Sequence, residues 1–200
     1  IDAAGDRHYA VKARELGRKG IVVGDLIDVV GMDASTVVDR DGRENFARIV
    51  RRAPRETTLR RTADDADPVE RVIVANADQL AVVVASTNPQ PRTGLIDRAL
   101  IAAFDAGIAP LLIVTKTDLA PATELMALYE PLGLPVMEVA NKEVTTHIRG
   151  LFAGHRTVLI GHSGVGKSTL VNALVPDAER TTGGVKEVTG KGRLTWSSVV

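Results

Sequence analysis

The sequence predicts a small all-β barrel followed by an α/β domain with a mainly parallel sheet. Over residues 1–56, short runs of β-branched residues alternate with glycines, a pattern typical of compact β-domains. From residue 71 onward, apolar runs of strand length alternate with amphipathic helical segments, as expected of parallel strands joined by right-handed crossovers. Residues 57–70 are interpreted as the linker between the two domains.

The N-terminal barrel is predicted from three short strands. Glycines mark its turns, and Asp41-Gly42 favours a hairpin. A small barrel of this kind suggests an oligonucleotide-binding (OB) fold with part of its first strand absent. Since the chain starts at Ile1 rather than at a methionine, we expect it to lack its natural beginning. The predicted strands span residues 8–13, 26–30 and 35–39.

Composition excludes several classes of protein. The 200 residues carry 25 basic and 25 acidic side chains, so any attraction to nucleic acid has to come from local patches. There is no cysteine, which excludes disulfides and thiolate metal sites within this chain and is compatible with a reducing cytosol. No apolar run reaches membrane-spanning length, and Ile1 does not begin a signal peptide. We therefore expect a cytoplasmic protein without a membrane partner.

A basic stretch follows the predicted barrel strands. Between residues 43 and 61, seven arginines oppose only two glutamates, which leaves a net charge of +5. These arginines could grip an RNA backbone, or they could form a solvated face that pairs with the acidic run over residues 64–67. Beside a strand-rich small barrel we favour RNA. The candidate RNA-binding residues are Arg43, Arg48, Arg51, Arg52 and Arg55.

The second domain is predicted from its apolar periodicity. Continuous apolar runs indicate buried parallel strands, and two of the helical segments are closed by Gly107 and Gly133. Strands are expected over residues 79–85, 110–114, 135–139 and 158–160, and helices over residues 95–104, 123–132 and 168–174.

The last of these strands runs into a phosphate-binding motif. Residues 161–168 have the spacing Gly-x-x-x-x-Gly-Lys-Ser, with a strand before and a helix after, which together define a P-loop. Its backbone N–H groups point inward at a helix N-terminus, where the helix dipole favours phosphate. Lys167 is expected to reach the β- and γ-phosphates, and the Ser168 hydroxyl to ligate Mg²⁺. The nucleotide-binding residues expected here are Gly161, His162, Ser163, Gly164, Val165, Gly166, Lys167, Ser168 and Thr169.

A second motif, Thr115-Lys116-Thr117-Asp118, stands at the end of the strand over residues 110–114. Ligands of open α/β sheets bind at the carboxyl ends of the strands. The Asp118 carboxylate can accept hydrogen bonds from N1–H and the exocyclic amine of guanine, a donor pair that adenine lacks. The Lys116 stem can lie along the base. The motif therefore favours GTP.

The order of the two motifs is unusual, because the guanine motif precedes the P-loop by about forty residues. In common GTPases the P-loop comes first, so the domain is interpreted as circularly permuted. At this point the chain resembles the circularly permuted GTPases of bacterial small-subunit ribosome assembly, the RsgA (YjeQ) family. The resemblance rests on the arginine-flanked barrel, Asp78-Gln79-Leu80, the two motifs, and residues 181–185 and 190–193.

The resemblance implies a function that the motifs alone do not. It implies a factor that hydrolyses GTP to GDP and phosphate, binds the 30S ribosomal subunit late in maturation and leaves after hydrolysis. It also implies that the N-terminal barrel touches 16S rRNA, that Mg²⁺ accompanies the nucleotide, and that Zn²⁺ is held by a C-terminal segment beyond the residues of this chain. We expect a monomer.

Three departures from the family pattern stand out. The family's Asn in the guanine motif is Thr115, whose hydroxyl can still bond neighbouring backbone. The Ser-Ala-Lys that supports the base reads Ala140-Asn141-Lys142, so Ala140 and Asn141 are the candidate nucleotide-binding residues there. After Gly192-Arg193, Leu194 stands in place of the family's His and no Asp-x-x-Gly loop follows. The catalytic candidates are Lys167, Ser168 and Thr195, the last also as a second Mg²⁺ ligand.

Three other functions remain open. A permuted GTPase could act on the large subunit, although an N-terminal barrel argues against this. A P-loop ATPase or small-molecule kinase would be distinguished by nucleotide competition. An RNA-binding module without enzymatic activity is disfavoured by the intact P-loop.

Overall fold

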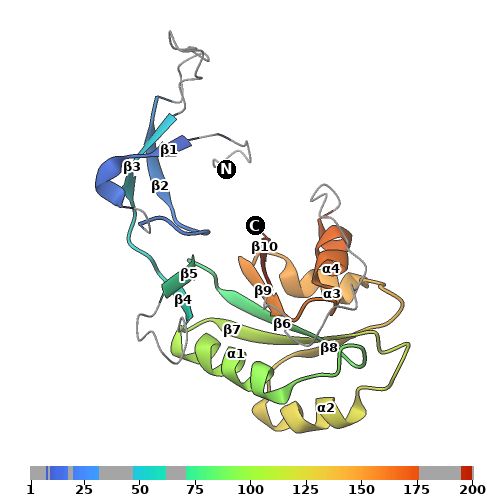
Figure 1. The fold of residues 1–200 in the computed structure, drawn as a ribbon. Coiled ribbons are helices and arrows are strands. Elements are labelled where there is room, and N and C mark those ends of the chain that lie inside the picture. Colours follow the sequence, from blue (N-terminus) through green and yellow to red (C-terminus); the bar gives the residue numbers. More distant parts are fainter. Residues whose placement is uncertain are drawn as a thin grey trace. The chain divides into compact units, whose positions relative to one another are not determined.

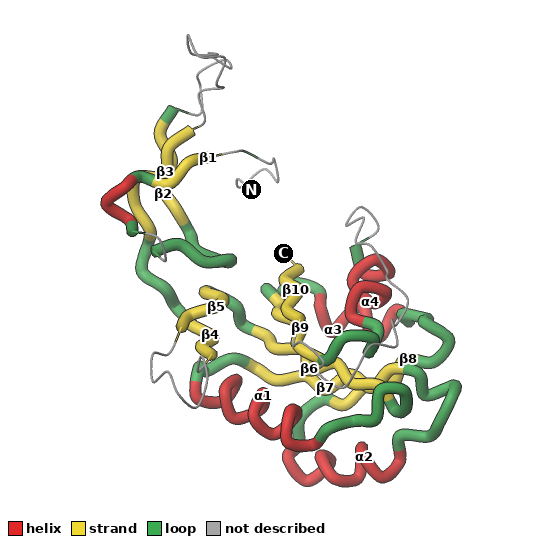
Figure 2. The backbone as a smooth tube through the Cα atoms, in the orientation of Figure 1, coloured by secondary structure: helices red, strands yellow, loops and turns green. Residues whose placement is uncertain are grey.

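The structure is a computed structural model that describes residues 8, 10–17, 20–31, 47–61, 71–175 and 195–199. The chain divides into two compact units, Ile1–Asn76 and Ala77–Val200. Figure 1 shows their elements as a ribbon, and Figure 2 shows the same elements along a smooth tube.

The described part of the first unit contains two small sheets. In the first, the central strand β3 pairs in parallel with β1 and antiparallel with β2. In the second, β4 and β5 form an antiparallel pair. The elements are β1 (Ala10–Lys12), the 3-10 turn η1 (Arg14–Leu16), β2 (Ile27–Val30), β3 (Ala47–Arg52), β4 (Thr58–Arg61) and β5 (Arg71–Ala75).

The boundary between the units lies later than the sequence predicted. Residues 57–70 were expected to be a linker, but β4 lies within them and pairs with β5. The pair belongs to the first unit because Asn76, which follows β5, donates a 2.8 Å hydrogen bond to the Gly24 carbonyl and accepts one of 2.8 Å from the Glu56 N–H. Leu59 of β4 is also buried, with 2% of its surface exposed.

The predicted OB barrel is not closed among the described residues. The strand expected over residues 35–39 and the turn at Asp41-Gly42 lie outside them. The strands expected over residues 8–13 and 26–30 are present as β1 and β2. The described part of the first unit contains five strands and one 3-10 turn, and the assignment of this unit to the OB fold stays a prediction.

The second unit is an α/β sheet with strand order β10-β9-β6-β7-β8. Strands β9, β6, β7 and β8 are parallel, and β10 is an antiparallel edge strand. Helices α1 and α2 cover one face of the sheet, and α3 and α4 cover the other (Figure 1). The predicted mainly parallel sheet is confirmed. Its elements are β6 (Gln79–Ala85), α1 (Thr93–Asp105), β7 (Ala109–Thr115), α2 (Thr123–Tyr129), η2 (Glu130–Leu132), β8 (Val136–Val139), α3 (Thr146–Phe152), β9 (Thr157–Gly161), α4 (Lys167–Leu174) and β10 (Thr195–Val199).

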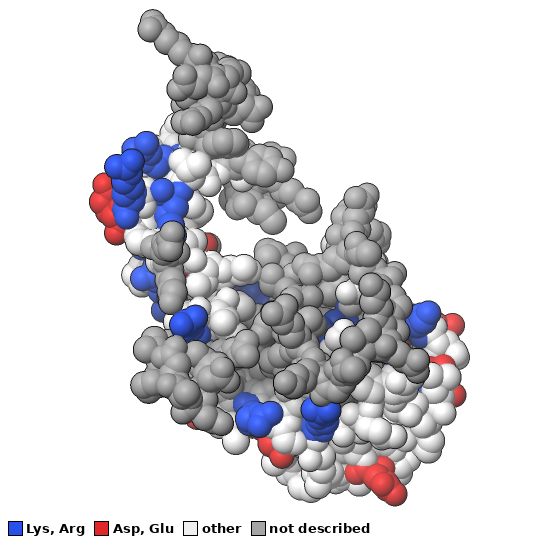
Figure 3. Space-filling view, in the orientation of Figure 1, with Lys and Arg blue, Asp and Glu red and all other residues white. Residues whose placement is uncertain are grey.

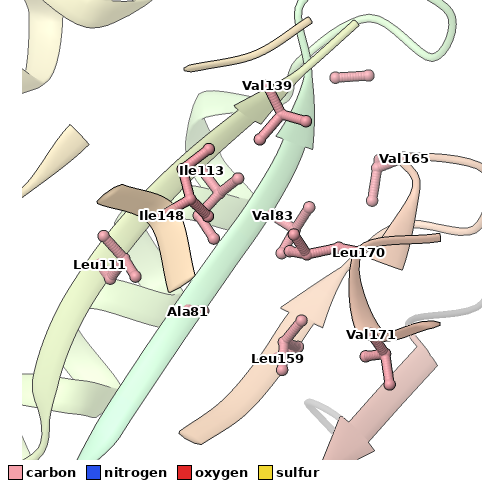
Figure 4. Close-up of a cluster of buried hydrophobic side chains, with 11 residues drawn as sticks. Ala81, Val83, Leu111, Ile113, Val139, Ile148, Leu159, Val165, Leu170 and Val171 are labelled. Atoms are coloured by element: carbon pink, nitrogen blue, oxygen red, sulfur yellow. The ribbon is translucent and has the colours of Figure 1, made fainter. Parts of the chain in front are cut away.

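The central strand β6 contributes buried side chains to both faces of the sheet. Ala81, Val83 and Ala85 are fully buried in the cluster under α3 and α4, most of which Figure 4 labels. Because side chains alternate along a strand, the buried Leu80 and Val82 face the opposite helices. Burying each such aliphatic side chain contributes about 1.5–3 kcal/mol. The cluster is completed by Leu111, Ile113, Val139, Ile148, Leu159, Val165, Leu170 and Val171.

Two helices differ from the sequence expectation. The helix predicted over residues 123–132 is α-helical only to Tyr129, and Pro131 lies in the 3-10 turn that follows. Proline lacks the N–H that would continue the α-helical ladder. Helix α3 was not predicted, although Thr145 caps it by accepting a 3.3 Å hydrogen bond from the Ile148 N–H.

Candidate nucleotide-binding site

The carboxyl ends of three neighbouring parallel strands form the edge at which the two sequence motifs meet. Strand β6 lies between β9 and β7, with Val82 opposite Ile160 and Ala85 opposite Thr115. The P-loop leaves β9 and the guanine motif leaves β7, so both flank the end of β6. Ligands of open α/β sheets bind at such an edge.

Glycine is required at two positions of the P-loop for different reasons. At Gly161 an added Cβ would lie 2.2 Å from the Val83 carbonyl oxygen, so only glycine lets β9 end so close to β6. Gly166 has a φ of 98°, in the left-handed region that side chains disfavour, and α4 begins at the next residue. The sequence between them therefore folds as the strand, turn and helix that the motif requires.

Lys167 lies inside the P-loop and not on its surface. Its ammonium donates hydrogen bonds to the carbonyl oxygens of Gly161, at 2.8 Å, and His162, at 2.7 Å. Burial leaves 6% of the residue exposed and lowers the pKa of the ammonium to about 8. A phosphate anion would favour the charged form of the same group.

The surroundings of the P-loop are cationic. The pKa of His162 is lowered by burial and then by the charges of Arg92, Lys167 and Arg98. Arg92 precedes α1 and Arg98 lies within it, so the loop that follows β6 contributes positive charge to the site. Sequence reasoning missed both arginines; the position of Arg92 in the segment that follows the central strand was the available signal.

The guanine motif forms a turn at the end of β7. The Asp118 Oδ1 atom accepts a 2.8 Å hydrogen bond from the backbone N–H of Asn141, which follows β8. The predicted base-binding segments, residues 115–118 and 140–141, are therefore adjacent. Lys116 has a φ of 60°, and its ammonium donates to the Asn88 carbonyl oxygen. Asn88 was also missed, although an Asn-Pro pair after a strand end predicts a turn there.

Thr115 links the guanine motif to the P-loop. Its side chain is buried, and its hydroxyl lies 2.6 Å from the carbonyl oxygen of Val165. The expectation that this hydroxyl bonds neighbouring backbone is confirmed. Thr117 lies in the same turn as Asp118, and Ala140 follows the last residue of β8.

The structure describes the two candidate Mg²⁺ ligands, Ser168 and Thr195, to different extents. Ser168 is the second residue of α4, directly after Lys167, and Thr169 follows it; both are half-buried. Thr195 pairs through its backbone with Gly161 as β10 runs antiparallel to β9, so it lies beside the start of the P-loop. Nothing is described of its side chain, and its role as a ligand stays a prediction.

The candidate RNA-binding arginines belong to the first unit and differ sharply in exposure. Arg43 lies outside the described residues. Arg48 and Arg51 are exposed on β3, whereas Arg52 is half-buried at its end. Lys and Arg side chains gather over this unit with acidic side chains beside them (Figure 3). Arg51 pairs with Asp28 at the surface.

Arg55 has a structural partner. Its Nε atom lies 2.6 Å from Asp25 Oδ1 and its guanidinium also donates to Oδ2 at 2.8 Å. The Asp25 side chain is 1% exposed and that of Arg55 15%. Burial alone would raise the pKa of Asp25, but hydrogen bonds from Arg55 and the Val22 N–H, with the charges of Arg55 and Arg52, lower it. Asp25 was not singled out in the sequence.

Within the described ranges, no group of three or more His, Cys, Asp or Glu side chains could hold a metal ion. In the same part of the chain, no helix is both long enough and apolar enough to span a bilayer.

A P-loop and a guanine motif on one edge of a parallel sheet define a nucleotide-binding domain of the GTPase class. A model of the family described as RsgA GTPase matches residues 52–200, well over half of the chain. The chain belongs to the RsgA GTPase family.

Several relatives and solved structures are similar to this chain. The small ribosomal subunit biogenesis GTPase RsgA of Pseudomonas syringae pv. syringae is 37% identical over 203 residues, covering 94% of this chain and 58% of that protein. The protein of the same name from Pseudomonas aeruginosa PAO1 is 41% identical over 167 residues, covering 80% and 48%. The chain thus spans about half the length of the curated relatives it matches.

The solved structures share the fold. YjeQ from Thermotoga maritima superposes with a TM-score of 0.62 at 24% identity, covering 88% of this chain and 59% of that one. YloQ, described as a circularly permuted GTPase, has a TM-score of 0.56 at 24% identity, covering 84% and 55%.

Proposed function

We propose that this chain forms the GTP-binding part of a GTP-hydrolysing factor that acts in maturation of the small ribosomal subunit. The observation that supports it is the bond between Thr115 and Val165, which holds a guanine-type motif against a P-loop. The names of the relatives give the ribosomal context. Since the chain spans about half of those relatives, the activity and partners of the whole protein are part of this proposal.

One set of residues would bind the base of the nucleotide and another set its phosphates. The Asp118 carboxylate would accept the two guanine donors, and the backbone at Ala140 and Asn141 would support the base from the neighbouring loop. The P-loop amides and Lys167 would hold the phosphates, where the ammonium exchanges its carbonyl partners at Gly161 and His162 for phosphate oxygens.

The hydroxyl donor at this site fits Mg²⁺, which Ser168 would help to hold. Ser168 offers a hydroxyl oxygen in the first turn of α4, and oxygen is the donor atom that Mg²⁺ selects, usually with few protein ligands and several waters or phosphate oxygens. Thr195 would be the second protein ligand. When bound, Mg²⁺ neutralises charge that develops on the transferring phosphoryl group.

The first unit is the proposed RNA-binding part, as an OB fold that contacts 16S rRNA. Arg48 and Arg51 are exposed on β3, where they could neutralise backbone phosphates. The factor would act in the cytoplasm as a monomer and leave the 30S subunit after hydrolysis. Zn²⁺ would be bound by a C-terminal segment that lies beyond the residues of this chain.

Competition binding and sedimentation test this proposal. A fluorescent GDP analogue should be displaced by GTP and GDP and not by ATP, and the complete protein with a non-hydrolysable GTP analogue should sediment with 30S particles. Equal displacement by ATP would indicate a P-loop ATPase or kinase. Sedimentation with 50S particles alone would indicate a large-subunit factor.

A further inference from the structure

The carbonyl oxygen of Lys116 closes the turn that carries Asp118. The Leu119 N–H donates a 2.9 Å hydrogen bond to this oxygen, so residues 116–119 form a β-turn with Asp118 as its third residue. Lys116 itself has a φ of 60°, in the left-handed region that residues with a side chain disfavour. The turn that presents the carboxylate therefore depends on contacts from outside itself.

The segment that follows β6 supplies these contacts. The Ser86 Oγ atom donates a 2.8 Å hydrogen bond to the Lys116 carbonyl oxygen, which has two lone pairs and can accept from both donors. The Ser86 N–H donates another 2.8 Å bond to the Thr115 carbonyl oxygen. Two residues further on, Asn88 accepts a hydrogen bond from the Lys116 ammonium. Lys116 is thus held at its backbone by Ser86 and at its side chain by Asn88.

The Asp118 turn is anchored from both sides of β7, which lies between β6 and β8 in the sheet. On the β8 side, the Asn141 N–H bonds the carboxylate directly. On the β6 side, the Ser86 hydroxyl bonds the carbonyl that closes the turn. Ser86 is half-buried, so water competes less for its hydroxyl than at an open surface. Its loss would free the turn on the β6 side.

We propose that Ser86 is a positioning residue whose hydroxyl holds the Asp118 turn in the orientation that recognises the exocyclic amine of guanine. This role rests on the proposed function, in which the Asp118 carboxylate accepts two hydrogen bonds from the base. Two parallel hydrogen bonds demand a more exact orientation of the carboxylate than one bond does. Hypoxanthine keeps N1–H and lacks the exocyclic amine. A shifted turn should therefore weaken binding of guanine more than binding of hypoxanthine.

Three variants of the complete protein isolate the hydroxyl. Ser86→Ala removes it with little change of volume, and Ser86→Thr keeps it and adds a methyl group. Thr87→Ala is the control in the same segment, because among the described residues the Thr87 hydroxyl makes no hydrogen bond to the guanine motif. If the threonine variant does not fold, the two alanine variants carry the comparison. All measurements are made at a temperature where circular dichroism shows the variants folded.

We expect Ser86→Ala to weaken GDP binding at least about fivefold, the effect of removing one neutral hydrogen bond. Binding of inosine diphosphate, whose base is hypoxanthine, should weaken less than about twofold. Ser86→Thr and Thr87→Ala should keep the parental ratio of the two affinities. Without nucleotide, the NMR signal of the Asn141 amide, which reports the position of the Asp118 carboxylate, should shift in Ser86→Ala and stay in place in Thr87→Ala.

The opposite outcomes would overturn the role of Ser86. Equal losses of affinity for GDP and inosine diphosphate would make Ser86 a purely structural residue. An unmoved Asn141 signal in Ser86→Ala would show that the hydroxyl does not position Asp118, and a folded Ser86→Thr variant that behaves like Ser86→Ala would show the same. These results would leave the proposed function standing. A parent protein that binds no guanine nucleotide would overturn the proposed function, and the role of Ser86 with it.

Discussion

The carboxylate of Asp118 accepts a 2.8 Å hydrogen bond from the backbone N–H of Asn141. The two residues follow different strands, β7 and β8, that pair in parallel. The bond holds the carboxylate that we propose to recognise the base beside the loop that we propose to support it. A carboxylate has further lone pairs, so Asp118 can keep this bond and still accept from guanine.

Asp118→Asn tests the base-recognising role. The amide presents a donor where guanine also presents its exocyclic amine, and xanthine has a carbonyl at that position. GTP affinity should fall at least about tenfold, or about 1.4 kcal/mol, while affinity for xanthosine triphosphate rises. Competition among GTP, ATP and xanthosine triphosphate measures this. Glu138→Gln, on the exposed side of β8, is the control that changes a carboxylate outside the site.

The lowered pKa of Lys167 predicts that nucleotide binding depends on pH. In the free protein burial lowers its pKa to about 8, and bound phosphate should raise the pKa again. Below pH 8 both states carry the proton. Above it the free protein loses the proton and the complex keeps it, so binding takes up a proton and affinity falls by up to about tenfold per pH unit.

Calorimetry at pH 8.5–9, in two buffers with different ionisation enthalpies, counts this proton. Lys167→Arg is the matched control because its guanidinium does not titrate, and proton uptake should shrink in that variant. Ionisation of guanine itself contributes equally to both proteins. Uptake that is the same in parent and variant would contradict the role of Lys167.

Arg55 should stabilise the first unit. Removing it leaves the Asp25 carboxylate, 1% exposed, without its main partner. Breaking a buried ion pair from one side costs about 3 kcal/mol, so Arg55→Met should speed hydrogen exchange of β3 and β5 amides. Arg51→Met, which changes an arginine that is 77% exposed, should change stability by less than about 1 kcal/mol. Equal protection in the two variants would contradict this division.

Arg48 and Arg51 should instead affect RNA binding. Neutralising both to glutamine should weaken binding of 16S rRNA fragments and reduce the slope of log affinity against log salt by roughly two, about one for each phosphate that an arginine no longer neutralises. Arg149→Gln, on the exposed surface of α3, is the control for the loss of one positive charge outside β3, and each single arginine variant is compared with it. An unchanged slope would indicate that the two arginines form a solvated strand face and do not contact RNA phosphates.

Intrinsic GTP hydrolysis should be slow. In the described part of the site, Lys167 and Ser168 are the residues that we propose to hold phosphate and metal, and we identify no described side chain that orients the attacking water. Turnover on the order of 10⁻⁴ to 10⁻³ per second is expected for such a site. Mature 30S subunits should accelerate it at least about tenfold, which corresponds to about 1.4 kcal/mol of barrier.

Single-turnover hydrolysis by the complete protein, with and without purified subunits, measures this acceleration. Stimulation by 50S particles alone would support the large-subunit alternative. A rate unaffected by either subunit would contradict the ribosomal part of the proposal.

The strands and helices of the second unit could largely be predicted because their signals are local. The apolar run over residues 79–85 became β6 with the same bounds, and the run over residues 158–160 became the centre of β9. Pro131 shortened a predicted helix, although its lack of an N–H was visible in the sequence. Strand β4 was missed because pairing with β5 stabilises its four residues, whereas β5 was overlooked although its run Val72-Ile73-Val74 is rich in β-branched residues.

By itself, the sequence determined the P-loop, the guanine motif and their permuted order. Glycine spacing, a terminal carboxylate and apolar periodicity act over a few neighbouring residues, so these features do not depend on the rest of the chain. Only the tertiary structure decided that Thr115 bonds Val165, that Lys116 bonds Asn88 and that Arg55 pairs with Asp25. Each of these contacts joins residues far apart in the chain. They exist because strand order and burial bring those segments together, and a buried polar group must then find a partner.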